Sequence, residues 1–448
     1  MNARRGRLAW LAAALGALMA LTIATQPAGA ATRERPCNGS VELCARPFDQ
    51  VVLPGTHNSM SAEDLGWKIP NQLISIPRQL DGGIRGFLID THYGRRAPDG
   101  TVTKVSRSEG AANGDTMYLC HELCQLGASE LIPELAKVSD YLAANPREVI
   151  LFVNQDGITP ADYARAVTES GLSGYLYTGS TTQWPTLSQM IASNQRVVML
   201  AEGATGDVPW YHDGYDGTMR ETPYDFRVPG GTTQDGIDNL TNPAKLEESC
   251  RPNRGGDTGT LFLMNHWVNG MLDNSNAVAP DPAVARILNQ KDALVNRARA
   301  CQQRRGKLPT LVAVDDFGEG DLLGAVRELN GVVAKPFLET AKPRNATVKA
   351  GRRAVYRVSV SNYGDAAGSV KVCAAVSARL AKKPACVTVE VAIGATATAP
   401  IKVWTKRRRK GASGKVNFTL TTAGDSVKTA SSLKVKPLPK KKRPKKRR

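Results

Sequence analysis

The sequence predicts an α/β fold in which a parallel sheet closes into a (β/α) barrel, followed by a small β-sandwich. Residues 45–335 alternate between apolar, strand-like runs and helical patterns, which is typical of a parallel sheet. After Pro336 the chain changes to Val- and Thr-rich alternation with turns, which is typical of an antiparallel sandwich of about 90 residues. The two patterns together indicate a larger α/β region and a smaller all-β region.

Seven apolar runs are the expected strands of the barrel: Gln50–Leu53, Ile84–Asp90, Met117–Cys120, Val149–Asn154, Arg196–Ala201, Leu261–Asn265 and Leu311–Asp315. Three segments between or after them have the apolar spacing of helices: Ser129–Ala143, Pro282–Ala300 and Asp321–Asn330. The Gly-rich stretch Gly203–Asp257 has weak periodicity, so we expect loops there that cover one face of the barrel.

The C-terminal part contains strand patterns at Ala354–Ser361, Cys386–Val391 and Val416–Thr421. The predicted organisation is a signal peptide at 1–30, a barrel domain at 31–340, an immunoglobulin-like β-sandwich at 341–435 and a basic disordered tail at 436–448.

The N-terminus has the composition of a secretory signal. Arg4, Arg5 and Arg7 precede the apolar run Leu8–Ile23, and small residues at Ala28–Ala30 suit a cleavage site. We therefore expect a secreted protein that is extracellular or associated with the cell surface.

The eight cysteines suit an oxidising compartment. The preferred disulfides join neighbours along the chain, although spacing leaves the connectivity open: Cys37–Cys44, Cys120–Cys124, Cys250–Cys301 and Cys373–Cys386. A zinc site at Cys120, His121 and Cys124 is the disfavoured alternative, because no second ligand pair has zinc spacing.

The 448 residues carry a formal net charge of +18, and this charge is unevenly distributed. From Lys342 onward there are 28 lysines and arginines against three acidic residues, so the preceding region is acidic overall. The basic C-terminal region predicts binding to an anionic membrane or cell-wall surface, with nucleic acid as a further possible partner.

Polar residues stand at the end of each expected barrel strand, where the enzymes of this architecture hold their chemistry. In chain order they are His57 and Asn58, Asp90 and His92, His121 and Glu122, Asn154 to Asp156, Glu202, Asn265 and His266, and Asp315 and Asp316. In a barrel these side chains converge on one mouth, which predicts an active site there.

At these positions the chain resembles the phosphatidylinositol-specific phospholipase C X-domain-like family, in a bacterial secreted form. The resemblance rests on LPGTHNSM (53–60), GIRGFLID (83–90), LCH (119–121), EVILFVN (148–154) and VDDF (314–317). It implies an irregular TIM-like barrel and a phosphoric diester hydrolase that cleaves a phosphoinositide to diacylglycerol and a cyclic inositol phosphate.

The resemblance also implies the roles of the catalytic residues. His57 would take the proton from the attacking inositol hydroxyl, and His121 would protonate the leaving oxygen. Imidazole suits both roles near neutral pH. Asp315, or else Asp316, would orient one imidazole. The expected substrate contacts are Arg85, Glu202, Trp210, Tyr211 and His266.

The need for a metal is less clearly implied. Asp90 stands where one branch of the family has an arginine, which favours the calcium-dependent branch and makes Asn58, Asp90 and Asn154 the candidate Ca²⁺ ligands. Leu88 and Asn154 replace expected acidic ligands, so the alternative is a site without a cofactor. The rival functions are a glycerophosphodiesterase or sphingomyelinase-like diesterase, a catalytically weakened barrel that acts as a surface-binding protein, and an adhesin.

Overall fold

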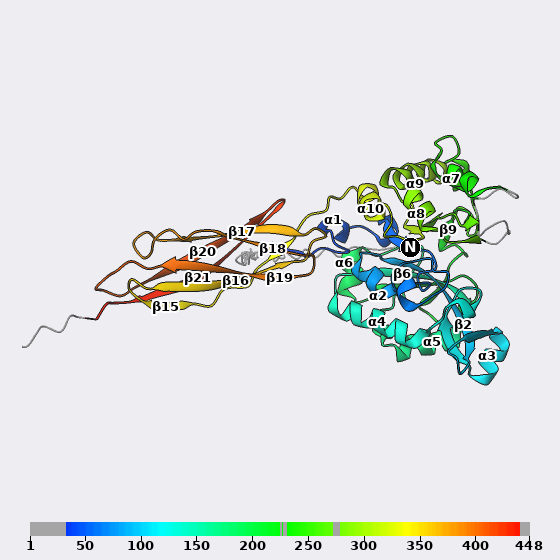
Figure 1. Ribbon diagram of the computed structural model, residues 1–448, viewed down its shortest axis with the longest axis horizontal. Coiled ribbons are helices and arrows are strands. Elements are labelled where there is room, and N and C mark those ends of the chain that lie inside the picture. Colours follow the sequence, from blue (N-terminus) through cyan, green and yellow to red (C-terminus); the bar gives the residue numbers. More distant parts are fainter. Residues whose placement is uncertain (1–32, 225, 227–230, 272–277, 440–448) are drawn as a thin grey trace, which may run out of the picture. The chain divides into compact units, whose positions relative to one another are not determined.

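The structure is a computed structural model that describes residues 33–439, apart from 225, 227–230 and 272–277 (Figure 1). The predicted signal peptide and the end of the predicted tail lie outside the described residues. Within the described ranges, no helix combines the length and apolar character needed to cross a membrane.

The larger sheet is parallel for most of its width but does not close, so the predicted closed, irregular TIM-like barrel is wrong. Eight strands follow one another in the order β8-β7-β6-β2-β1-β13-β10-β9, and the two edge strands do not pair with each other. The strands are β1 (Leu53–Thr56), β2 (Gly86–Arg96), β6 (Ile150–Gly157), β7 (Val197–Ala201), β8 (Tyr211–Asp213), β9 (Met219–Glu221), β10 (Leu261–His266) and β13 (Leu311–Val314).

The two edge strands of the open sheet are short. β8 and β9 have three residues each and lie in the Gly-rich stretch for which the sequence predicts loops. The turn between them contains Gly217 at φ 78°, a conformation that favours glycine. Besides these strands, the same stretch forms helix α7 (Thr233–Thr241).

The third predicted barrel strand belongs to a different arrangement. Strand β4 (Thr116–Leu119) runs antiparallel to β2 and pairs with its extended second half, with Thr91 opposite Leu119. β2 is 11 residues long and continues past the end of its parallel neighbours. β3 (Val102–Val105) and β5 (Ser129–Glu130) complete this antiparallel part of the 11-stranded sheet.

Helices cover one side of the parallel sheet, and α2, α4 and α5 lie beside β2 and β6 (Figure 1). Helix α4 forms because Leu131, Leu135, Val138 and Leu142 make one apolar stripe, which is buried against the sheet. The helices of this region are α1 (Val41–Cys44), α2 (Ile76–Asp81), α3 (Arg107–Asn113), α4 (Leu131–Ala144), α5 (Pro160–Glu169), α6 (Leu187–Ala192), α8 (Pro282–Leu288), α9 (Lys291–Arg305) and α10 (Leu322–Asn330).

The sequence predicts one helix over Pro282–Ala300, and the structure has two. The break is at Asn289, whose side-chain amide donates to the backbone carbonyls of Asp315 and Asp316. The residue therefore ties the break between α8 and α9 to the loop that follows β13.

Both faces of the parallel sheet are buried, as expected for parallel strands. In β6, Ile150 and Phe152 face the helices, whereas Leu151 and Val153 belong to a second apolar cluster on the opposite face. This alternation explains why the strands read as continuous apolar runs, and it leaves the polar positions at the ends of the strands.

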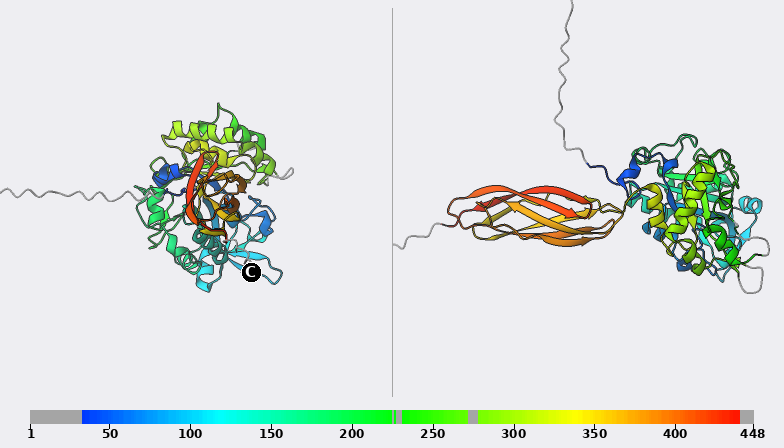
Figure 2. Two further views of the ribbon diagram at one scale, coloured as in Figure 1. Left: turned by 90° about the vertical axis from the view of Figure 1, so that its left-hand side faces the viewer. Right: turned by 90° about the horizontal axis from the view of Figure 1, so that it is seen from above.

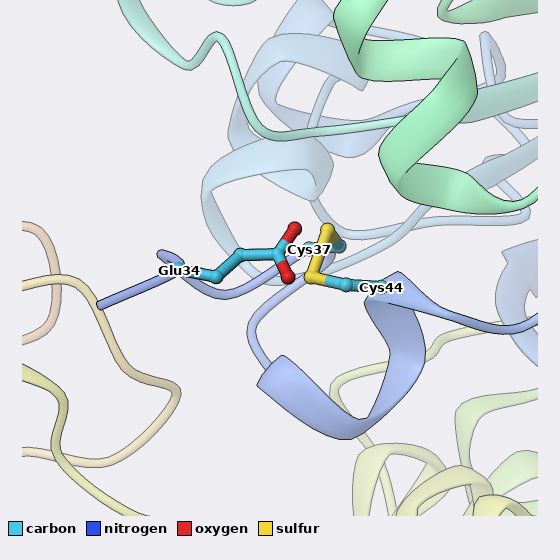
Figure 3. A group of neighbouring side chains, drawn as sticks. All are labelled: Glu34, Cys37 and Cys44. Atoms are coloured by element: carbon cyan, nitrogen blue, oxygen red, sulfur yellow. A yellow bond between two sulfur atoms is a disulfide. The ribbon is translucent and has the colours of Figure 1, made fainter. Parts of the chain in front are cut away.

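All four preferred disulfides are present, which confirms the predicted pairing. Figure 3 shows the Cys37–Cys44 bond. Because Cys120 and Cys124 are bonded to each other, neither sulfur is a thiolate that could bind zinc.

The residues after Pro336 form two further sheets around one apolar core. One has three strands in the order β14-β16-β19, and the other has five in the order β15-β21-β20-β17-β18. Figure 2 shows the two sheets face to face. Their strands are β14 (Leu338–Glu339), β15 (Ala346–Lys349), β16 (Arg353–Asn362), β17 (Gly368–Val376), β18 (Val387–Val391), β19 (Thr396–Trp404), β20 (Ala412–Thr422) and β21 (Asp425–Lys436).

Candidate active site

His57 and Asp315 lie close together because they follow two neighbouring parallel strands. Thr56 of β1 is paired with Val314 of β13, and the amide of His57 donates to the carbonyl of Val314. The next residue of each strand therefore reaches the same edge of the sheet. Nδ1 of His57 is 2.9 Å from Oδ1 of Asp315.

Three further side chains hold the His57 ring in place. Asn71 donates to the same Asp315 oxygen at 3.0 Å, and Gln72 donates to the backbone carbonyl of His57 at 2.9 Å. Trp267 stacks on the imidazole with ring centroids 3.7 Å apart and an interplanar angle of 5°. An ionised carboxylate only accepts hydrogen bonds, so Asp315 favours the tautomer with the proton on Nδ1 and leaves Nε2 as the basic nitrogen.

His121 makes a second pair of the same kind. Its Nδ1 is 2.6 Å from Oδ2 of Asp90, which pairs with Gln155 in the parallel part of β2. The antiparallel return of β4 makes this contact possible, since Cys120 donates to the carbonyl of Asp90. Burial lowers the pKa of His121, but the hydrogen bond and negative charge of Asp90 outweigh burial and raise it above its ordinary value.

The two imidazoles face a common space. Their ring centroids are 6.5 Å apart, and their planes are inclined by 74°. Each ring uses Nδ1 for its carboxylate, so Nε2 of each is on the side away from that carboxylate. A group that is small enough to enter between the rings could be deprotonated at one side and protonated at the other.

The backbone turns sharply directly after each of these residues. Asn58, Glu122 and Asp316 have φ values of 44°, 47° and 41°, in the left-handed region that non-glycine residues seldom adopt. They immediately follow His57, His121 and Asp315. Strained backbone of this kind is concentrated at functional sites, where the surrounding contacts stabilise it.

The structure places Asp315, and not Asp316, at the imidazole. Asp316 is 2% exposed, and its backbone amide donates to the carbonyl of Asn71. Burial and the neighbouring charge of Asp315 raise the pKa of Asp316 to about 7.

Glu202 belongs to an ion-pair cluster where the sheet is open. Arg254 donates to Glu202 at 2.7 Å and to Glu221 of β9 at 2.7 Å, so one guanidinium links the end of β7 to the opposite edge of the sheet. Tyr215 also donates to Glu221, at 2.9 Å. Burial raises the pKa of Glu202, and the charge of Asp90 adds to this effect.

The other predicted substrate contacts are not brought to the two imidazoles. Arg85 precedes β2, at the opposite end of the strand from Asp90, and pairs with Glu148 at 2.6 Å. His266 is fully buried between the carbonyl of Leu288 and the guanidinium of Arg297, and burial lowers its pKa to about 3.

Trp210 and Tyr211 lie on the helix-covered side of the sheet. Tyr211 is buried and accepts a hydrogen bond from Asn154 at 2.7 Å, and both aromatic rings pack against Tyr163 of α5. Their side chains therefore contribute to packing in this structure.

The three candidate Ca²⁺ ligands do not fit a tight calcium site. Asn154 is fully buried, and its amide is engaged by Thr91 and Tyr211. Asp90 is the single carboxylate of the set, and one of its oxygens is bonded to His121. Asn58 donates to Asn71 at 3.3 Å. Calcium takes six to eight oxygens, several of them from carboxylates, and this set supplies too few.

Sequence reasoning missed Asn71, Glu221 and Arg254, since none stands in a motif that marks it. From the sequence, Trp267 beside His266 is a candidate for the substrate rim, with packing as the alternative, but its stacking on His57 depends on the fold. Arg254 lies in the Gly-rich stretch, and its partners are 52 and 33 residues away.

Comparisons with known proteins point to one family. A protein-family model described as PI-PLC X 1 matches residues 43–330. Among curated proteins, an uncharacterized secreted protein of the fungus Arthroderma benhamiae is 29% identical over 66% of this chain and 63% of its own length, so the chain spans less than two thirds of it. The PI-PLC X domain-containing protein 1 of the same fungus is 28% identical over 71% of this chain and 96% of its own length. These relatives are fungal, so the bacterial form that the resemblance implied is not supported.

A solved α2-macroglobulin structure from Escherichia coli covers 23% of this chain and 17% of its own, at 20% identity. Its TM-score of 0.18 is too low to carry an argument about the fold.

The secreted relative and the four disulfides are consistent with an extracellular location. The family match covers more than half of the sequence and includes His57, His121 and Asp315. The chain belongs to the PI-PLC X family.

Proposed function

We propose that this protein is a secreted phospholipase C-like phosphodiesterase that cleaves phosphatidylinositol to diacylglycerol and a cyclic inositol phosphate. Family membership supports phosphodiester chemistry at the coarse level. The observation that supports the finer statement is the pair of imidazoles 6.5 Å apart, each bonded through Nδ1 to its own carboxylate.

The proposed reaction needs one proton acceptor and one proton donor. Nε2 of His57 takes the proton from an inositol hydroxyl as that oxygen bonds to phosphorus, and the bond from phosphorus to the glycerol oxygen breaks. Nε2 of His121 gives its proton to the leaving oxygen. The raised pKa of His121 suits the donor, because it favours the protonated imidazole.

Exposed apolar residues near the two imidazoles support a lipid substrate. Leu65, Ile69 and Leu73 are 37–40% exposed in the loop after β1, and Leu123 is 58% exposed beside His121. The two loops are joined, since Lys68 donates to the carbonyl of Leu126 at 2.8 Å. An exposed apolar rim is typical of a surface that meets lipid or protein.

The test of the proposal is the release of diacylglycerol from phosphatidylinositol vesicles, with phosphatidylcholine vesicles as the control. Release from both lipids alike would favour a phosphodiesterase with a different head group, such as the glycerophosphodiesterase or sphingomyelinase-like alternative. Binding without any release would favour the surface-binding protein.

Replacing Asp90 with asparagine should change the pH dependence of the reaction. The carboxylate raises the pKa of His121, so its removal leaves the effect of burial, which lowers that pKa. A general acid works only while protonated, so the alkaline limb of kcat/KM should move to lower pH by about 1 to 3 pH units. The exposed Asp140→Asn on α4 is the matched control, and an unmoved limb in Asp90→Asn would contradict the role of His121.

A chelator should have little effect, because the candidate calcium ligands supply a single carboxylate. After dialysis against EDTA, we expect diacylglycerol release within about twofold of the untreated protein. A loss of more than about tenfold that added Ca²⁺ restores would show that Asn58, Asp90 and Asn154 rearrange to bind the ion.

We also propose that the basic region after Pro336 holds the protein at an anionic surface, by the attraction of lysine and arginine to negatively charged lipid or cell-wall polymer. The charge of this region supports the idea, since its described part, residues 342–439, has 20 lysines and arginines and three acidic residues.

A further inference from the structure

One end of the outer face of strands β16 and β19 differs from the rest of that face. The two strands are paired antiparallel with Arg353 opposite Trp404 and Val355 opposite Lys402 (Figure 1). Burial alternates along both strands, so these residues point away from the apolar core. The far end of the same face carries hydroxyl side chains, with Ser359 opposite Thr398.

The basic end of this face, which we name the Trp404 face, consists of Arg353, Val355, Arg357, Lys402 and Trp404. Trp404 is 52% exposed and Val355 is 45% exposed. The guanidinium of Arg353 lies over the indole of Trp404, 5.8 Å from the ring centroid. A partner that buries this indole would gain binding free energy, because the indole is a large apolar group with one polar atom.

The acidic residues of the region are elsewhere. Asp365 pairs with Arg327, whereas Glu390 on β18 and Asp425 on β21 belong to the other sheet. Glu339 shares the sheet of β16, but it is opposite Ser361 at the far end and pairs with Arg35. The Trp404 face is therefore cationic without a carboxylate among its own residues.

We propose that the Trp404 face docks on a bilayer that contains anionic phospholipid. Arg353, Arg357 and Lys402 supply the charge, and lysine or arginine near such a surface strengthens binding about fivefold each. The indole and Val355 supply the apolar contact, because tryptophan favours the boundary between head groups and acyl chains. A polyanion such as nucleic acid would use the three cations but would not need Val355.

The inference rests on the proposed function only because both take lipid as the partner of the protein. Binding to vesicles is therefore measured separately from diacylglycerol release. The full chain is sedimented with phosphatidylcholine vesicles with and without phosphatidylglycerol. Three variants are compared with the wild type: Trp404→Ala, Lys402→Glu, and Lys371→Glu as the matched control. Lys371 is exposed on β17 of the other sheet, so its reversal changes the net charge equally.

We expect Lys402→Glu to weaken binding to the anionic vesicles by about 25-fold and Trp404→Ala by about tenfold. The Lys371 variant should differ from the wild type by less than about threefold. Equal loss in both lysine variants would overturn the proposal, since charge alone would then explain binding. The proposal would also be overturned, in favour of nucleic acid, if Trp404→Ala bound vesicles as the wild type does and Lys402→Glu lost binding to a DNA duplex. Thermal unfolding shows that each variant is folded, and His57→Ala should bind as the wild type does.

Discussion

The His57→Ala variant is expected to lose about two to four orders of magnitude in kcat/KM for phosphatidylinositol cleavage, while it keeps its fold. The imidazole is the basic group at the end of β1, and Asp315 and Trp267 hold it in one orientation. Alanine leaves the attacking hydroxyl without a proton acceptor, so the chemical step slows whereas binding of the head group is less affected. The measurement is initial-rate diacylglycerol release over a range of substrate concentrations.

His212→Ala is the matched control for that experiment. His212 is half-buried in the middle of β8, where it bonds to the carbonyl of Tyr177 at 3.1 Å, and it has no part in the imidazole pair. Its loss should change kcat/KM by less than about fivefold. Equal activity of His57→Ala and the wild type would show that another group accepts the proton.

The second large effect concerns stability. Arg297 of α9 is fully buried, and Ser249 and the carbonyl of Asn265 are its partners, together with Thr222. Burial lowers the pKa of Arg297 to about 9, so the guanidinium remains charged at neutral pH. Arg297→Ala removes the donor to several buried acceptors and leaves a cavity, so the free energy of unfolding should fall by about 3–5 kcal/mol.

Denaturant unfolding of Arg297→Ala and Arg299→Ala tests this expectation. Arg299 is two residues away on the same helix but is exposed, with Gln302 as its partner at 3.2 Å. We expect its substitution to cost less than about 0.5 kcal/mol. A similar cost for both variants would show that the buried contacts of Arg297 are not what stabilises this part of the fold.

The sequence predicted most of the parallel strands but not the open sheet, and the first strand begins at Leu53, where the predicted strand ends. Runs such as Val149–Asn154 and Leu311–Asp315 are apolar because both faces of a parallel strand are buried, so they are visible without a structure. Whether a sheet closes depends on its edges, and β8 and β9 are short strands in a stretch that has no strand pattern. The sequence also did not indicate the direction of β4, because its composition suits parallel and antiparallel pairing equally.

Strand ends predicted the core of the candidate site but not its surroundings. His57, His121 and Asp315 were expected together, and the register of β1 with β13 brings the first and last of them into contact. His266 does not reach the two imidazoles, because successive residues of a strand point to opposite faces and its side chain faces α8 and α9. Arg85 does not reach them either, because it precedes β2 instead of following it.

Arg254 shows the limit of reasoning from local patterns. Its structural role depends on ion pairs with Glu202 and Glu221, which the fold brings to it from two different strands. A loop arginine has no periodicity, and a single sequence does not reveal distant ionic partners.

In the proposed mechanism, two carboxylate-bonded imidazoles cleave a phosphodiester by acid–base chemistry. The most direct measurement is phosphorus NMR of the water-soluble product from phosphatidylinositol vesicles, for the wild type and for His57→Ala and His121→Ala. We expect a cyclic inositol phosphate from the wild type and almost none from either variant. A linear monoester as the first product, or cyclic phosphate from a protein that lacks either imidazole, would contradict the account.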